Sequence, residues 1–341
     1  MSWDGTELDV ADTSDNAAFF GYGGNDRSRS AFPKARLVTL SECASRAVVG
    51  VGVGAHHDGE RDLTRLTLGA LEPDMLLLAD AGFYSWDLLG EVTQVGAHAA
   101  WRVGGSLELP VIAPLADGSY TALVFVSRTG RVWRERLIAQ ARAGEGVDAE
   151  RARLVRVAEY TVPDRKAQGE LICVLTTVMD PLLVPAVEIV WAYKRRWEHE
   201  TAFAEIKTHL RGGGVVLRSK SARMTVAEIY GLLLAHYAMR ALMCAAADET
   251  EVAADRLSFL GAVRVVRRHA LGGAAFPPEQ RAWVYGVVLE QVAQRCLPAR
   301  RHRSCPRVIK RVRHSSFPIK RAHHVSVLHT GPPTPLISPA A

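Results

Sequence analysis

Residues 193–207 read Tyr193-Lys-Arg-Arg-Trp-Glu-His-Glu-Thr-Ala-Phe-Ala-Glu-Ile-Lys207, and this stretch is the most informative part of the chain. Four of its residues follow the spacing Tyr-x2-Arg-x3-Glu-x6-Lys, and they are Tyr193, Arg196, Glu200 and Lys207. In an α-helix, at about 100° per residue, these four side chains fall within an arc of about 60°. The opposite side can face a core, because it carries Val187, Trp191, Ala202, Ile206 and Leu210. The stretch therefore predicts a helix that presents a carboxylate, two cations and a phenol on one stripe.

Such a stripe suits chemistry on phosphodiesters. A carboxylate can bind a divalent metal ion, and Arg or Lys can bind phosphate groups. A plainer interpretation is also open, because Arg196 and Glu200 lie four residues apart and can form an ordinary surface ion pair on a helix. The choice between the two depends on the remainder of the chain.

The composition indicates a globular protein with a sizeable core. The chain has 341 residues, of which 48% are hydrophobic. No apolar run approaches the ~20 residues that span a membrane, and the N-terminus is short, acidic and polar rather than a signal peptide. Five scattered cysteines suggest reduced thiols. We therefore expect a cytoplasmic protein without a membrane partner.

Charge is distributed unevenly along the chain. Residues 291–341 contain ten Lys or Arg and no Asp or Glu, so residues 1–290 hold 32 basic and 36 acidic residues, a net charge of −4. The basic tail, from Arg295 to Arg321, is a plausible binding segment for a polyanion such as DNA. The alternative is a solvated, disordered basic end.

Hydrophobic periodicity predicts an α/β protein. We expect strands over residues 1–10, 36–44, 46–53, 75–79, 97–103, 120–127, 152–162 and 170–178. Helices are expected over residues 60–71, 85–95, 226–247, 255–269 and 278–293, with a loop over residues 13–30 and another helix start at Pro185. The region between residues 104 and 178 is rich in short strands and resembles an insertion.

Two further carboxylates occupy positions that fit a metal site. Asp4 lies on or just after the first strand, and Asp80 follows the apolar strand Met75–Ala79. A carboxylate at the end of a buried strand needs a partner, and a metal ion is one. Two-metal phosphoryl-transfer sites use carboxylates from different elements around ions about 3.5–4 Å apart. Oxygen ligands favour Mg²⁺ or Mn²⁺ over zinc.

Three blocks of the chain together resemble the catalytic blocks of a DDE transposase. They are Asp4-Gly-Thr6, Leu76-Leu-Leu-Ala-Asp80-Ala-Gly-Phe83 and the stripe of residues 193–207. More narrowly, the chain resembles the IS-four group of bacterial insertion-sequence transposases. The similarity continues through Leu217-Arg-Ser-Lys220, Glu228–His236, Arg256–Phe259 and Cys305–Arg311.

The resemblance implies a ribonuclease-H-like mixed sheet flanked by helices, with a β-rich insertion before the last catalytic helix and a helical, basic C-terminus. It implies that Asp4, Asp80 and Glu200 hold two Mg²⁺ or Mn²⁺ ions, and that Tyr193, Arg196 and Lys207 contact DNA. The expected parts are residues 1–103 and 179–270 for the catalytic core, 104–178 for the insertion and 271–341 for the basic region. The implied partner is double-stranded DNA at transposon ends and targets, bound by a homodimer.

Two departures from the family pattern lead to a further expectation. The chain starts three residues before Asp4, where the family has an N-terminal DNA-binding domain, and Ala81 stands where the family often has a basic residue. We therefore expect a truncated transposase copy, with a sheet that is incomplete around its first strand. Two alternatives remain: an inactive fragment that binds DNA or intact subunits, and a metal-dependent nuclease without transposition.

Three minor patterns allow other interpretations. Cys296, Cys305, His302 and His314 could bind zinc, although their spacing is not a standard one. His56-His57 beside Asp58 and Glu60 could bind a metal but fits a polar loop better. Trp133 could stack on a base, with packing as the more ordinary role.

Overall fold

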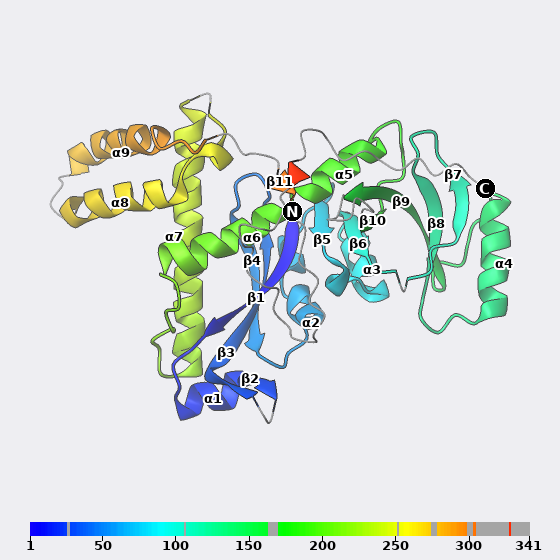
Figure 1. The fold of residues 1–341 in the computed structure, drawn as a ribbon, viewed down its shortest axis with the longest axis horizontal. Coiled ribbons are helices and arrows are strands. Elements are labelled where there is room, and N and C mark those ends of the chain that lie inside the picture. The colour runs from blue at the N-terminus through cyan, green and yellow to red at the C-terminus, as the bar shows by residue number, and fades with distance from the viewer. Residues whose placement is uncertain are drawn as a thin grey trace. The chain divides into compact units, whose positions relative to one another are not determined.

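The computed structural model describes residues 1–25, 28–105, 107–162, 170–250, 252–273, 278–298, 303–304 and 327–328. These residues form two compact units (Figure 1). The first unit comprises residues 1–79, 94–97 and 195–299, and the second contains residues 80–93 and 98–194. The expected division at residues 103, 178 and 270 differs from these limits and remains a prediction.

The sheet of the first unit is built around β1 (Ser2–Asp9). Its neighbours are β3 (Ser28–Ser41), antiparallel over eight residue pairs, and β5 (Leu76–Ala79), parallel with Ser2 opposite Leu78. β4 (Val48–Ala55) and β2 (Tyr22–Asn25) both pair antiparallel with β3. β1 is therefore a full eight-residue strand with a neighbour on each side, and Asp4 lies within it rather than at its end. The pairing of β1 with β5 involves the first residues of the chain, with Ser2 opposite Leu78, and the expectation of a sheet left incomplete around this strand stays a prediction.

The predicted loop over residues 13–30 was also wrong. It contains α1 (Ser14–Phe20), β2 and the start of β3. The side chain of Thr13 caps α1 by accepting a hydrogen bond from the backbone N–H of Asn16 at 3.3 Å. Gly21 then ends the helix with a φ of 69°, a conformation that a residue without Cβ adopts readily.

Helices cover the sheet of the first unit, and some of them also pack against one another in a separate apolar cluster. The helical elements here are α2 (Glu60–Arg65), η1 (Leu68–Ala70), α6 (Trp197–Ala204), η3 (Glu205–Leu210), α7 (Ala222–Asp248), η4 (Ala254–Arg256), α8 (Phe259–Gly273) and α9 (Pro278–Ala293). α7 packs Ile229 and Leu233 against apolar residues of β1, β3 and β4, and its C-terminal half packs against α8 and α9. α8 and α9 lie side by side in Figure 1. The helical part of the predicted C-terminal region is thus present in α9.

α7 is the one helix among the described residues that is long and apolar enough to cross a membrane by length and composition. The same properties belong to core helices of soluble proteins, and α7 buries His236 and Arg240 beside the carboxylate of Glu205. The composition of α7 is therefore accounted for by its place in a protein core.

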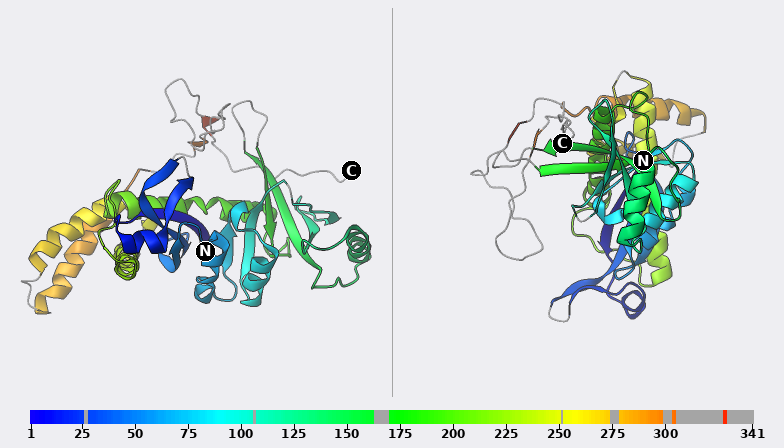
Figure 2. Two further views of the ribbon diagram at one scale, coloured as in Figure 1. Left: turned by 90° about the horizontal axis from the view of Figure 1, so that it is seen from below. Right: turned by 90° about the vertical axis from the view of Figure 1, so that its right-hand side faces the viewer.

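The second unit contains an antiparallel sheet. Its strand order is β6 (His98–Val103), β10 (Glu170–Thr176), β9 (Ala152–Val162), β8 (Tyr120–Phe125) and β7 (Val111–Pro114). Its helical elements are η2 (Ala81–Phe83), α3 (Trp86–Gln94), α4 (Arg131–Arg142) and α5 (Ala186–Lys194). Figure 2 shows the long β9 and β10 arrows of this sheet. The β-rich character predicted here is confirmed, whereas α4 was not predicted. In the chain that follows α9, Arg303–Ser304 and Val327–Leu328 pair as the short strands β11 and β12.

The fold class expected from the sequence is confirmed. The protein is α/β, with a mixed, ribonuclease-H-like sheet arrangement flanked by helices, and a strand-rich segment precedes the helix that carries Glu200.

Candidate active site

Asp4 belongs to a polar patch on one face of the first sheet. Side chains two residues apart on a strand share a face, so Ser2 and Asp4 lie on the same side of β1. Their antiparallel partners on β3 are Ser41, opposite Ser2, and Thr39, opposite Asp4. Ser2, Thr39 and Ser41 are almost completely buried. The patch therefore needs a polar partner from another element.

His199 of α6 is that partner. Its Nδ1 lies 2.7 Å from the hydroxyl of Ser2, and its Nε2 lies 2.6 Å from that of Thr39 and 3.1 Å from that of Ser41. Burial, assisted by the nearby charge of Arg196, lowers the pKa of His199 to about 3. A neutral imidazole thus fixes α6 on the sheet, immediately before Glu200 in the chain.

Arg196 brings two of the predicted acidic residues to one place. Its Nη1 lies 3.7 Å from Oδ2 of Asp4, and its Nη2 lies 3.8 Å from Oε1 of Glu200. The Arg196 side chain is 9% exposed, whereas those of Asp4 and Glu200 are 21% and 45% exposed. Two carboxylates from different elements therefore flank a single, nearly buried cation at a site that remains open to solvent.

Asp80 follows β5 directly and belongs to the second compact unit. Its Oδ1 accepts a hydrogen bond from the backbone N–H of Ala81 at 2.8 Å, which caps η2. β5, the strand that leads to Asp80, runs parallel to β1, the strand that carries Asp4. The position of Asp80 at a strand end agrees with the sequence, and its role as a metal ligand remains a prediction.

The single regular helix expected over residues 193–207 was wrong. α5 ends at Lys194, a turn covers Arg195 and Arg196, α6 follows, and η3 is a π-helix. The backbone at Arg196 keeps helical angles, with φ −53° and ψ −32°. π-helical turns arise where tertiary contacts outweigh regular α-helical hydrogen bonding, and they are frequent at functional sites.

The predicted DNA-contacting residues differ in exposure. Tyr193, at the end of α5, is 6% exposed and belongs to the second unit. Lys207 lies in η3 and is half-buried, and burial together with the charge of Arg211 lowers its pKa. As predicted, Ala202 and Ile206 face the core. DNA contacts by Tyr193, Arg196 and Lys207 remain predictions.

A buried charge network, not predicted from the sequence, anchors the same segment from its other side. Glu205 of η3 accepts hydrogen bonds from Arg46 at 3.0 Å and from Nε of Arg240 at 2.9 Å, and His236 lies 3.1 Å away. Arg46 also bonds Glu198 at 2.7 Å. Burial by itself would raise the pKa of Glu205, but hydrogen bonds from His236 and Arg240 and the charges of Arg240 and Arg46 lower it to about 2.

Among the described residues, no three His, Cys, Asp or Glu side chains are grouped so that they could hold an ion, and this applies to the acids Asp4, Asp80 and Glu200 as well as to the remaining candidate groups. His56 lies 2.7 Å from Glu7, which also pairs with Arg36, as expected for a polar loop. In the zinc interpretation, Cys296 is exposed, whereas His302, Cys305 and His314 lie outside the described residues. Trp133, on α4, is 42% exposed and has Arg151 over its ring at 4.4 Å.

Comparisons with known proteins identify the family of the chain. The profile of the family described as "Transposase DDE domain" matches residues 2–238. The chain is 25% identical over 315 residues to the transposase InsG of insertion sequence element IS4 from Escherichia coli strain K12. The aligned region covers 91% of this chain and 67% of that protein. A solved piggyBac transposase synaptic complex with hairpin DNA is similar with a TM-score of 0.45 and 8% identity, over 85% of this chain and 57% of that chain. The chain belongs to the DDE-domain transposase family.

Proposed function

We propose that this protein cleaves DNA at insertion-sequence ends and joins the freed 3′-OH to target DNA in a reaction that depends on divalent metal ions. The observation that carries the proposal is the pairing of Asp4 and Glu200 with one cation, Arg196, at distances of 3.7 and 3.8 Å. β1 and α6 supply these two acids, as a phosphoryl-transfer site requires. The similarity to the transposase of IS4 supports the same reaction class.

The residues at this site fit Mg²⁺ or Mn²⁺. Asp4 and Glu200 offer only oxygen donors, which suit hard divalent ions, and both already lie beside a positive group in the structure. We propose that Asp80 completes the ligand set, as the family resemblance implies. Two bound ions would stabilise the negative charge that develops on the attacking and leaving oxygens of a phosphodiester.

The other residues of the proposed site orient the two carboxylates or bind the negatively charged DNA. Arg196 keeps the two carboxylates close together, and we propose that it contacts a DNA phosphate, with bound ions then balancing the charge of those acids. His199 orients Glu200 by fixing α6 on the hydroxyls of β1 and β3. Lys207 and Tyr193 are proposed to contact the transposon end, and the protein is proposed to act as a homodimer on double-stranded DNA.

The test is cleavage of a labelled duplex that carries an insertion-sequence end by the purified full chain, with Mg²⁺ or Mn²⁺ present. We expect cleavage and strand-transfer products from the unaltered protein and a loss of at least about 100-fold in Asp4→Asn, Asp80→Asn and Glu200→Gln, because each substitution removes a charged metal ligand. Asp62→Asn is the matched control, since that carboxylate is 75% exposed and forms a salt bridge with Arg65 on the surface of α2.

Other outcomes would identify the alternatives. Salt-dependent DNA binding without cleavage at any metal concentration would mark an inactive, DNA-binding chain. Hydrolysis of any DNA, with no joined product, would mark a nuclease. Equal activity in Glu200→Gln and the unaltered protein would contradict the assignment of the site itself.

A further inference from the structure

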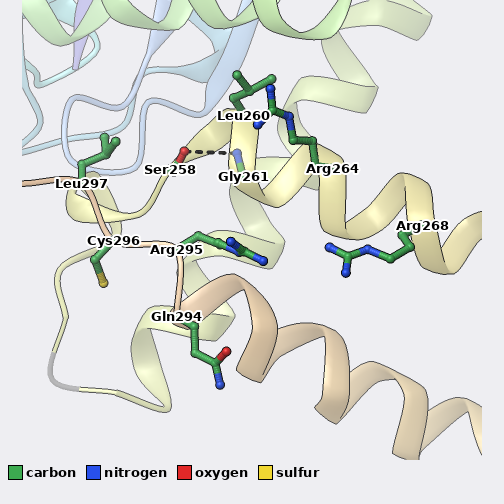
Figure 3. Close-up of a pocket in the computed structure, with 9 residues that line it drawn as sticks. All are labelled: Ser258, Leu260, Gly261, Arg264, Arg268, Gln294, Arg295, Cys296 and Leu297. Atoms are coloured by element: carbon green, nitrogen blue, oxygen red, sulfur yellow. Dashed lines mark hydrogen bonds between the residues drawn. The ribbon is translucent and has the colours of Figure 1, made fainter.

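A groove rich in arginine lies in the helical part of the first unit, outside the candidate active site. It has a volume of about 580 Å³ and is lined by α8, the residue before it and the segment that follows α9. Arg264 and Arg268 line it from α8, and Arg295 lines it from the chain after α9, with the guanidinium group of Arg264 turned toward Leu260 (Figure 3). In this view the guanidinium groups of Arg268 and Arg295 point toward one another across the groove. All three arginines are exposed to solvent.

The groove is held together by main-chain contacts. The backbone N–H of Ser258 donates to the carbonyl of Arg295 at 2.7 Å, and that of Leu297 donates to the carbonyl of Arg256 at 2.7 Å. Gly261, in the first turn of α8, permits this approach: a Cβ on it would lie 2.9 Å from Cβ of Arg295. Arg295 is therefore set in place by its backbone, so its position opposite Arg268 does not depend on long side chains alone.

The positive charge in the groove is not neutralised by the described part of the chain. None of the nine lining residues is acidic, and none of the three guanidinium groups has a salt bridge or side-chain hydrogen bond to a described residue. The carboxylate of Glu290 accepts a hydrogen bond from Gln294 instead. A single exposed arginine is ordinarily just solvated, but two guanidinium groups that face one another across a concave surface, with a third arginine on the same helix, form a site for an anion with several charges.

We propose that this groove binds the sugar–phosphate backbone of duplex DNA. Arg264 and Arg268 are one helical turn apart, about 6 Å along the axis, which lets them reach neighbouring phosphates of one strand. Guanidinium groups bind phosphate oxygens in pairs, without reading the base sequence. The inference rests on the proposed function, because it takes DNA as the substrate, and it adds a contact surface that is separate from the acids Asp4 and Glu200.

The test compares two double variants of the full chain that lose the same charge. Arg268→Gln/Arg295→Gln removes groove contacts, whereas Arg223→Gln/Arg281→Gln removes two exposed arginines outside the groove. Affinity for a labelled random-sequence duplex is measured by fluorescence anisotropy across a salt series. We expect the groove variant to bind more weakly and to lower the slope of log K against log salt by about 2, because each phosphate contact contributes about 1. The control should change the slope much less.

A second variant separates geometry from charge. Gly261→Ala keeps every arginine but places a methyl group against Cβ of Arg295, so it should displace that residue and reduce DNA affinity at unchanged net charge.

Cys296 lies beside Arg295 and is exposed. In a Cys305→Ser background, DNA should slow the reaction of the Cys296 thiol with a maleimide reagent. Thermal melts of each variant establish that it is folded.

The outcomes distinguish the groove from the rest of the proposal. Equal affinities and slopes in the groove and control variants, with no protection of Cys296, would overturn the groove as a DNA site. If the groove variant sediments differently but binds DNA with unchanged affinity, the groove is not a DNA site and contacts protein instead. These measurements are made without metal, so a failure of DNA cleavage in the previous test does not affect them.

Discussion

At the scale of the residue, His199 links the sheet to Glu200 and gives the fold a pH dependence. Its pKa of about 3 in the folded protein lies below its ordinary value of 6.5, because burial disfavours the charged ring. Below pH 6.5 the unfolded chain takes up a proton here that the folded chain does not. Stability is therefore full above pH 6.5 and falls as the pH drops toward 3, with a slope of up to about 1.4 kcal/mol per pH unit.

This slope is measured by urea unfolding between pH 6 and pH 5. His199→Gln should remove that part of the pH dependence while lowering stability at pH 7, since glutamine does not titrate and replaces only part of the hydrogen bonding. His57→Gln is the control, because His57 is 74% exposed. An unchanged slope in His199→Gln would show that the ring takes up its proton over the same pH range in the folded and the unfolded chain.

The sequence predicted that the acids Asp4 and Glu200 share a site, but it did not predict the residue that holds the Glu200 helix on the sheet. Asp4 and Glu200, nearly two hundred positions apart, were expected at one site, and the structure places both beside Arg196. His199 was not singled out, although it lies inside the same signature. Its partners, Ser2 and Thr39, are distant in the chain, and no local pattern reveals which histidine a sheet will bury.

At the scale of the element, the segment formed by α6 and η3 is held by Glu205. Its carboxylate is nearly buried and accepts hydrogen bonds from two buried guanidinium groups, those of Arg46 and Arg240. Glu205→Gln should lower the free energy of unfolding by about 3–5 kcal/mol, because removing one member of a buried ion pair leaves the others uncompensated. Urea unfolding measures this, with Asp62→Asn expected to cost at most about 1 kcal/mol, as exposed pairs do. Equal losses in the two variants would show that the network contributes no more than a surface pair.

The same network explains why the sequence was a poor guide to this segment. Periodicity predicted one helix through Lys207, since the apolar positions recur at helical spacing. The structure has a π-helix over residues 205–210, where the buried partners of Glu205 come from α7 and from the turn before β4. Strands with clear apolar patterns, such as β9 at Ala152–Val162, were placed correctly. α1 and β2 were missed because the Gly, Ser and Asn around them favour a loop locally.

At the scale of the whole molecule, charge is divided between a weakly acidic body and a basic end. The net charge is +6, and nine Lys or Arg residues lie between Arg300 and Arg321. Replacing these nine by Gln in the full-length chain changes the net charge from +6 to −3. We expect this variant to bind random-sequence duplex DNA more weakly at every salt concentration, with a smaller salt slope, because the basic tail supplies contacts that do not depend on sequence.

The residual binding of that variant then tests how the two basic surfaces share the DNA. If the tail and the groove of Arg264, Arg268 and Arg295 contact different phosphates, combining the tail variant with Arg268→Gln/Arg295→Gln should lower the salt slope by the sum of the separate decreases, since distant sites are additive. Anisotropy titrations from about 50 to 200 mM salt give both slopes. A combined decrease no larger than that of the tail variant alone would mean that the groove contacts DNA only when the tail has already bound it.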